Sequence, residues 1–171
     1  MLRFLQKKSK VPGDSIKIKA TSWSQPSKEI SEVRHKVFVV EQSIPPEIEM
    51  DGKDSDCIHF LALEQSKPIG AARLQKYGKI ERVSVLREYR TKGIGTAIMK
   101  MVIEKARDLD IEKIYLHSQM DSKNFYQQLG FVQHGKTFFE ADKPHIEMIL
   151  KGWLFENESR CIDYCRNVRR S

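Results

Sequence analysis

The chain has 171 residues, of which 40% are hydrophobic and 31% are charged, and its formal net charge is +7. This length suits one domain with one sizeable core, and the composition excludes a disordered or fibrous protein. No apolar run approaches the roughly 20 residues that a membrane-spanning helix needs, so we expect a protein that does not act in a membrane.

Positive charge is concentrated at the two ends of the sequence. Residues 1–19 have six basic side chains against one acidic side chain, and residues 151–171 have five against three, which leaves residues 20–150 neutral overall. Basic ends are more often solvated tails than a nucleic-acid-binding face, so the pattern argues against a nucleic-acid partner. The N-terminal apolar stretch is too short for a secretory signal, and a mitochondrial transit peptide is an open alternative to a cytoplasmic location.

The three cysteines predict reduced thiols. Cys57, Cys161 and Cys165 are odd in number and irregular in spacing, which argues against a disulfide framework. A metal site would need more ligands than the stretch from 161 to 165 offers, so we predict no metal and a cytoplasmic protein.

The first third of the chain predicts a strand, a helix and a loop after a flexible lead-in over residues 1–14. Apolar and polar side chains alternate over residues 16–21, which is the period of a strand with one wet face. Pro26 suits the first turn of a helix, and apolar residues then recur at spacings of three and four as far as Phe38. Residues 42–56 contain two prolines, a glycine and five acidic residues, which predict a long loop with a short helix at most.

Three apolar stretches separated by short turns follow, and such links predict antiparallel neighbours. These stretches are Cys57–Glu64, Ile69–Gln75 and Ile80–Leu86. The remaining predicted elements are a helix over 94–109, a strand over 114–117, a brief helix over 121–129, and strands over 131–139 and 145–150. A meander followed by β-α-β predicts an α/β domain over residues 15–150, with a mixed sheet whose faces are covered by helices. Residues 151–171 are predicted to be a C-terminal extension, for which a helix is one interpretation.

The segment Arg90–Thr96 carries the clearest chemical signal. It reads Arg-Thr-Lys-Gly-Ile-Gly-Thr, follows a predicted strand and opens a predicted helix. A helix start has free N–H groups and the positive end of the helix dipole, and glycines let the backbone approach an anion closely. The segment therefore predicts a phosphate cradle, with a glycine-punctuated helix start as the alternative. It is neither a Walker loop nor a full dinucleotide fingerprint.

In order and spacing, three segments resemble the GNAT (general-control-related N-acetyltransferase) superfamily: Ile80–Val85, Arg90–Gly95 and Gln119–Phe131. Further stretches are similar to one bacterial branch of it, namely Val37–Gln42, His59 and Phe139–Met148. The resemblance covers about residues 30–150. It implies the GNAT fold, with a mixed, mostly antiparallel sheet of about seven strands, a splay between strands 4 and 5, and helices on both faces. It also implies an N-acetyltransferase that moves an acetyl group from acetyl-CoA to a primary amine by direct transfer.

The resemblance implies where acetyl-CoA would bind. The backbone N–H groups of residues 92–96 would hold the CoA pyrophosphate, and the free strand edge at Val83–Val85 would pair with the pantetheine arm. The Val83 N–H would face the thioester carbonyl and stabilise the developing oxyanion. The cofactor contacts implied in this way are Val83, Ser84, Val85, Arg90, Thr91, Lys92, Gly93, Ile94, Gly95, Thr96, Gln119, Ser122, Phe125 and Tyr126. The chain departs from the family pattern at Gln119, where many members have asparagine, and at Ser122, where many have alanine.

Tyr126 matches the family tyrosine that protonates the departing thiolate. A phenol is a proton donor at neutral pH, which agrees with this role. The alternative is a tyrosine whose hydroxyl merely packs near the sheet.

The proton acceptor is less well defined, although an amine must lose a proton as it attacks. Glu81 is expected to share a strand face with Val83 and Val85 and to act as the base. Glu41 and a chain of waters are its rivals. The structural alternative for Glu81 is a solvated carboxylate or a partner for Arg82.

The acceptor stays open between a small-molecule amine and a peptide or protein amine. The acidic run Glu47–Asp56 would attract a cationic amine to the acceptor entrance, or would form a solvated loop. His59 and His145 are acceptor-site groups or hydrogen-bonded structural residues. Two other functions compete with catalysis: an acetyl-CoA sensor of the same fold, and an interaction protein whose basic ends contact nucleic acid. The Trp153–Phe155 cluster would dock on the domain's own core or on a second copy, so a homodimer is an open alternative.

Overall fold

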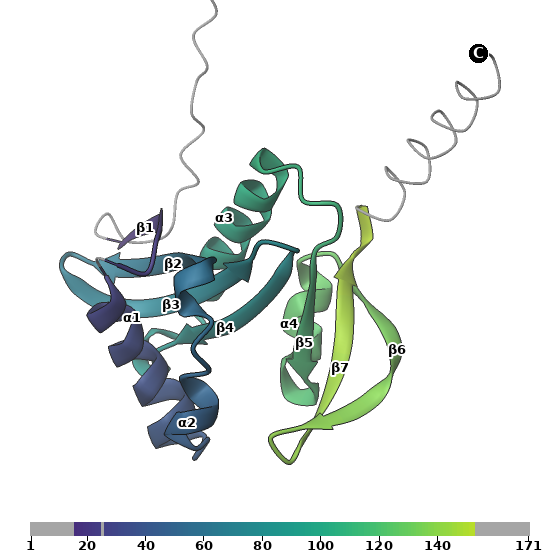
Figure 1. The fold of residues 1–171 in the computed structure, drawn as a ribbon, viewed down its shortest axis with the longest axis horizontal. Coiled ribbons are helices and arrows are strands. Elements are labelled where there is room, and N and C mark those ends of the chain that lie inside the picture. Colours follow the sequence, from purple (N-terminus) through teal and green to yellow (C-terminus); the bar gives the residue numbers. More distant parts are fainter. Residues whose placement is uncertain (1–15, 25, 153–171) are drawn as a thin grey trace, which may run out of the picture.

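Seven strands form one mixed sheet in the computed structural model, which describes residues 16–24 and 26–152 (Figure 1). Their order across the sheet is β1-β2-β3-β4-β5-β7-β6, and every neighbouring pair is antiparallel except β4 and β5. The strands are β1 (Ile16–Thr21), β2 (Cys57–Glu64), β3 (Lys67–Gln75), β4 (Lys79–Val85), β5 (Tyr115–Gln119), β6 (Phe131–Glu140) and β7 (Lys143–Leu150). The predicted α/β fold with a mostly antiparallel sheet is therefore confirmed.

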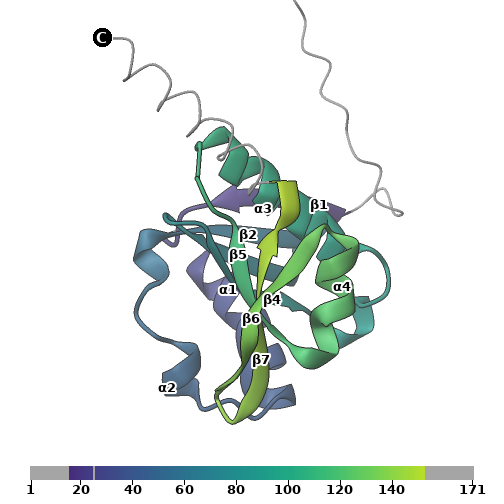
Figure 2. The same cartoon turned by 90° about the vertical axis from the view of Figure 1, so that its right-hand side faces the viewer.

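Helices cover both faces of the sheet, as predicted. They are α1 (Ser27–Arg34), the π-helix η1 (His35–Glu41), α2 (Pro46–Glu49), α3 (Ile94–Asp108) and α4 (Lys123–Gln128). Both α1 and α3 contact β3, and they approach it from opposite faces. Figure 2 looks at the molecule from the side of the β6–β7 hairpin, with α1 and α2 to one side of it and α4 to the other.

The core fills the space between these helices and the sheet. Ile30 and Val33 of α1 and Ile98 and Val102 of α3 are at most 1% exposed, and they follow the spacing of three and four that predicted amphipathic helices. The first predicted helix runs on beyond Phe38, because its last turns are the π-helix η1, a widened form that is frequent at functional sites.

The predicted terminal segments fall largely outside this description. Residues 1–14 and the extension beyond residue 152, including the tryptophan-phenylalanine cluster, lie outside the described residues. Within the described ranges, no helix is long and apolar enough to cross a membrane.

A bulge in β4 changes which of its side chains share a face. Between the pairings made by Glu81 and Ser84, two residues of β4 lie opposite a single residue of β3. One of the two, Arg82, has a φ of 54°, in the left-handed region that few non-glycine residues adopt. Because the extra residue reverses the alternation of side chains, Glu81 shares a face with Ser84 and not with Val85. The predicted common face of Glu81 and Val85 is therefore wrong.

The strands β4 and β5 pair over two positions only, Lys79 with Tyr115 and Ile80 with Leu116. Beyond Ile80 they separate, which Figure 1 shows as the opening between the two halves of the sheet. Residues 81–85 keep β3 on one side, and their other backbone edge faces this opening. The predicted splay between strands 4 and 5 is confirmed, and it leaves hydrogen-bonding groups of β4 available to a ligand.

The turn before β4 sets this geometry and can be tested at Gly78. Its φ is 87°, its carbonyl accepts the first β4–β5 hydrogen bond from Tyr115, and an added Cβ would lie 1.8 Å from the Lys113 carbonyl oxygen. Gly52 has a similar φ of 74° with no atom within 4 Å of an added Cβ, so it is a matched control. Gly52→Ala should lower the free energy of unfolding by about 1–2 kcal/mol from the left-handed φ alone. Gly78→Ala should lose about 1–3 kcal/mol more from overpacking, measured by urea unfolding. Equal losses in the two variants would contradict the close approach.

Candidate active site

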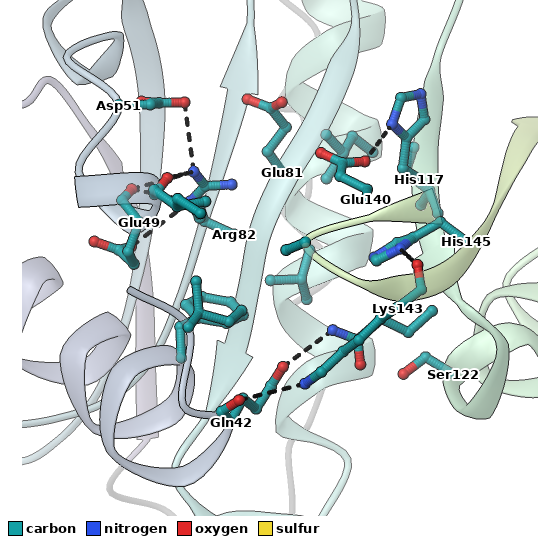
Figure 3. Close-up of a pocket in the computed structure, with 18 of the residues that line it drawn as sticks. Gln42, Glu49, Asp51, Glu81, Arg82, His117, Ser122, Glu140, Lys143 and His145 are labelled. Carbon is teal, nitrogen blue, oxygen red and sulfur yellow. Dashed lines mark hydrogen bonds and ion pairs between the residues drawn. The ribbon is translucent and has the colours of Figure 1, made fainter. Parts of the chain in front are cut away.

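A cavity of about 360 Å³ opens where β4 and β5 separate (Figure 3). Its walls come from β4, β5, the start of α4, the β6–β7 hairpin and the segment 38–53. This volume lies in the range of small-molecule sites. The predicted site residues that line it are Glu81, Val83, Gln119, Ser122 and Tyr126. The predicted site residues outside it are Ser84, Val85, Phe125 and the segment Arg90–Thr96.

The predicted phosphate cradle lies at the start of α3. Gly93 is the N-cap residue with a φ of 77°, and no side chain caps the helix. Thr91 has a φ of 62°, so the backbone turns twice through the left-handed region before the helix begins. An added Cβ at Gly93 would meet no atom within 4 Å, so the space beside this turn is open. Uncapped N–H groups at a helix start are the geometry that binds phosphates.

The predicted site residues Ser84, Val85, Gly95 and Phe125 pack the interior near the start of α3. An added Cβ at Gly95 would lie 3.3 Å from the Phe125 ring and 3.8 Å from Val85, so α3, α4 and β4 meet closely here. Ser84 is buried, and its hydroxyl donates to the carbonyl oxygen of Ala71 at 3.3 Å. Its side chain is thereby held away from the cavity.

Arg90 joins the segment before α3 to the π-helix η1, which contributes Phe38 to the cavity wall. Both terminal nitrogens of Arg90 donate to the Glu41 carboxylate at 2.6 Å, and its Nε donates to the Val85 carbonyl oxygen at 3.0 Å. The hydrogen bond from Arg90 lowers the pKa of Glu41, even though partial burial acts to raise it. Glu41, the rival base, is therefore held as an anion by an arginine.

Two buried arginines, Arg34 and Arg73, hold the acidic run against the sheet. Their side chains are at most 1% exposed, and each pairs with two or more carboxylates. The carboxylates are Glu49, Asp51, Asp54 and Glu81. A buried charge is tolerated only when it is paired, so these contacts are structural. Three carboxylates of the predicted acidic run, Glu49, Asp51 and Asp54, are thus paired with arginines, whereas Glu47 and Asp56 are exposed.

Glu81 is engaged on both oxygens. Oε2 accepts from Arg73 and from Gln75, and Oε1 lies 2.9 Å from the Lys79 ammonium. Burial acts to raise the pKa of Glu81, but the hydrogen bond from Lys79 and the attraction of Arg73 outweigh it and lower the pKa to about 2. A carboxylate with such a pKa holds a proton weakly at neutral pH and is a poor base.

Arg82 lines the cavity, although the sequence predicts it only as a partner of Glu81. Its guanidinium instead donates to the carbonyl oxygens of Ile48 and Glu49 at 3.0 and 3.1 Å and reaches Asp51 at 3.4 Å (Figure 3). The β4 bulge brings this side chain to the cavity, and no local residue pattern in the sequence marked that bulge. Arg82 therefore joins β4 to the α2 segment and fixes one wall.

Tyr126 lies on α4. It is 9% exposed and packs edge-on against the rings of Phe125 and Phe131, with centroids 5.0 and 6.0 Å apart. Burial raises the pKa of Tyr126, so the phenol keeps its proton at neutral pH. Its hydroxyl makes no hydrogen bond with any residue in the described part of the chain, and the residue lines the cavity.

The two predicted histidines have different environments. His59 is fully buried, lies outside the cavity, and has Nε2 2.8 Å from a backbone carbonyl oxygen, which favours the structural alternative. His145 lines the cavity, and its Nδ1 lies 2.9 Å from the Lys143 carbonyl oxygen. A third histidine, His117, also lines the cavity, and its Nδ1 lies 2.9 Å from the carboxylate of Glu140.

Comparisons with known proteins agree with this geometry. Residues 25–151 match the model of the acetyltransferase (GNAT) domain. The chain is 36% identical over 121 residues to the uncharacterised N-acetyltransferase YjcF of Bacillus subtilis, a match that covers 68% of this chain and 86% of the relative. An acyl-CoA N-acyltransferase from Pseudomonas aeruginosa has a similar structure, with a TM-score of 0.71 and 27% identity over 79% of this chain and 99% of the other. Escherichia coli ElaA is similar too, with a TM-score of 0.70 and 29% identity over 78% of this chain and 98% of its own.

The ion pairs of Glu81 predict a pH dependence of stability. Its pKa in the folded chain, about 2, is below its ordinary value of 4.5, so the pairing stabilises the fold above about pH 4.5 and is lost as the pH falls toward 2. Glu81→Gln should lower the free energy of unfolding at pH 7 and flatten its decline between these pH values, measured by urea unfolding. Glu104→Gln, at an exposed position of α3, is the control and should keep the parent slope. A parent-like slope for Glu81→Gln would show that these ion pairs add no stability.

Proposed function

Since the chain belongs to the GNAT acetyltransferase family and is an acetyltransferase, we propose that it moves an acetyl group from acetyl-CoA to a primary amine in one direct step. The observation that carries this proposal is the cavity at the β4–β5 opening. Val83, on the free backbone edge of β4, and Tyr126 both line this cavity. A hydrogen-bond donor for an oxyanion and an acid for a leaving group are the two elements that thioester aminolysis needs.

Acetyl-CoA is proposed to extend from the start of α3 to the free edge of β4. The N–H groups of residues 92–96 would hold the pyrophosphate, each charge-assisted bond contributing about 1.5–3 kcal/mol. The β4 edge from Val83 to Val85 would pair with the pantetheine arm, because β5 has left that edge free. The side-chain amide of Gln119 already donates to Gln42 at 3.0 Å. Gln119 would therefore support the cofactor site by holding a neighbouring segment of the chain. Ser122, on the cavity wall, is proposed as a further contact.

The chemical step follows from these positions. The amine nitrogen attacks the thioester carbon, and the Val83 N–H stabilises the oxyanion. Tyr126 then gives its proton to the CoA sulfur. The amine also gives up a proton, and Glu81 is a poor acceptor for it, since both of its oxygens are already engaged by cationic or amide donors.

A small amine, or the amine-bearing end of a peptide, suits the size of the cavity. Glu49, Asp51 and Asp54 of the acidic run are paired with arginines, so these three carboxylates do not attract a polycation as free charges. The acceptor is instead expected to be selected by the shape of the α2 segment and the β6–β7 hairpin.

The cofactor site is tested first by titration calorimetry with acetyl-CoA. Gly93→Glu and Gly93→Gln share the strain of a left-handed φ and nearly the same shape, and they differ in charge. The parent should bind in the micromolar range, and the Glu variant should bind at least about tenfold more weakly than the Gln variant because it repels the pyrophosphate. Equal affinities would contradict the cradle, and no binding by the parent would contradict the use of acetyl-CoA.

Transfer itself is tested at Tyr126 by release of CoA thiol with spermidine, kanamycin, L-lysine and an alanyl peptide amide. Tyr126→Phe keeps the ring contacts and should lower kcat by about 10²–10⁴-fold with little change in acetyl-CoA affinity. Tyr77→Phe is the control, because Tyr77 is 57% exposed and does not line the cavity. Unchanged kcat in Tyr126→Phe would remove the phenol from the step. Binding of acetyl-CoA without release of CoA thiol in the presence of any of these amines would favour a sensor.

A further inference from the structure

We propose that Nε2 of His145 accepts the proton of the attacking amine, an inference that rests on the proposed acetyl transfer. His145 lies on β7, in the half of the sheet opposite β4 (Figure 3). The two carboxylates predicted as bases are both paired with cations. Glu81 is paired with Arg73 and Lys79, and Glu41 is paired with Arg90. The cavity therefore needs another group that can take a proton.

The hydrogen bond of Nδ1 fixes which nitrogen of His145 is basic. Nδ1 lies 2.9 Å from the carbonyl oxygen of Lys143, and a carbonyl oxygen can only accept. Neutral His145 therefore carries its hydrogen on Nδ1 and presents a free lone pair on Nε2. The ring is 9% exposed and stacks on Phe138, with centroids 6.2 Å apart and planes 28° apart, so its orientation is held.

Other titratable groups of the cavity serve less well. His117 has a carboxylate near each ring nitrogen, with Nδ1 2.9 Å from Glu140 and Nε2 4.0 Å from Glu147. Nδ1 of His117 is therefore engaged by one carboxylate, and a second carboxylate lies beyond its Nε2. His145 has no ion pair with any residue that the structure describes. The other charged or titratable groups that line the cavity are Glu49, Asp51, Lys53, Lys79, Glu81, Arg82, His117, Tyr126, Glu140 and Lys143.

The proposed step moves two protons, one on each side of the reacting centre. The thioester would lie along β4 and the amine would enter between β4 and β7, with His145 behind it. As the nitrogen–carbon bond forms, the amine proton passes to Nε2. The carbon–sulfur bond breaks and the sulfur takes the proton of Tyr126. The imidazolium then gives a proton to solvent, and the tyrosinate regains one from solvent, so the net products are the amide and CoA thiol.

The decisive variant is His145→Asn. Asparagine keeps a nitrogen donor near the position of Nδ1, and so the bond to Lys143, while it removes Nε2. We expect kcat to fall by about 10²–10⁴-fold with the fastest of the four amines named above. We expect the KM for acetyl-CoA to change by less than about threefold. His145→Ala should recover part of its rate when imidazole is added. The control is His134→Asn, because His134 is exposed on β6, pairs with Glu147 and does not line the cavity.

Each outcome decides between the proposals. Transfer by the parent with an unchanged rate in His145→Asn overturns the role of His145 and leaves the acetyl transfer standing. Slow variants that imidazole does not rescue assign His145 to structure and also overturn the role. No transfer by the parent overturns both. A slow His145→Asn, imidazole rescue of His145→Ala and a parent-like His134→Asn together support it.

Discussion

The buried guanidinium of Arg73 is the constraint on which much of the architecture depends. It lies in the middle of the sheet with no exposed surface, where an unpaired charge would cost several kcal/mol. Its carboxylate partners come from the segment after α2 and from β4, so satisfying one charge pins a long connection onto the sheet. That connection, further held by Arg34, becomes one wall of the cavity. Glu49 and Asp51, which line the cavity on this wall, are therefore already paired with arginines in the folded chain.

The second constraint is the irregular course of β4. Its bulge brings Arg82 to the cavity, and its early parting from β5 leaves a strand edge unpaired. An unpaired edge is a liability in a sheet unless something covers it. Here α4 and the β6–β7 hairpin enclose the opening, so the edge faces a cavity of limited size. The position of the opening follows from backbone pairing more than from any single side chain.

Much of this fold could be predicted from the sequence, because the elements have clear periods and the glycine loop marks a helix start. The resemblance of its segment marked Tyr126 as a proton donor; the residue lines the cavity, and its role stays a prediction. The shared face of Glu81 and Val85 was wrong because strict alternation was assumed, and a bulge depends on pairing with another strand. The fate of the acidic run could not be predicted either, since its partners Arg34 and Arg73 are distant in sequence. The orientation of His145 depends on a backbone carbonyl, which side-chain patterns do not reveal.

The pair between Arg90 and Glu41 has a thermodynamic meaning. Arg90 belongs to the loop before α3, and Glu41 ends the π-helix that leads into the cavity wall, so the two proposed substrate sites share one ion pair. Linkage between sites is reciprocal: a cofactor that changes the Arg90 contact alters the acceptor wall by the same free energy with which an acceptor alters the loop. Glu41 is the last residue of η1, and its neighbour Gln42 lines the cavity. Coupling carried by this ion pair would be the same whichever of the two sites is filled first.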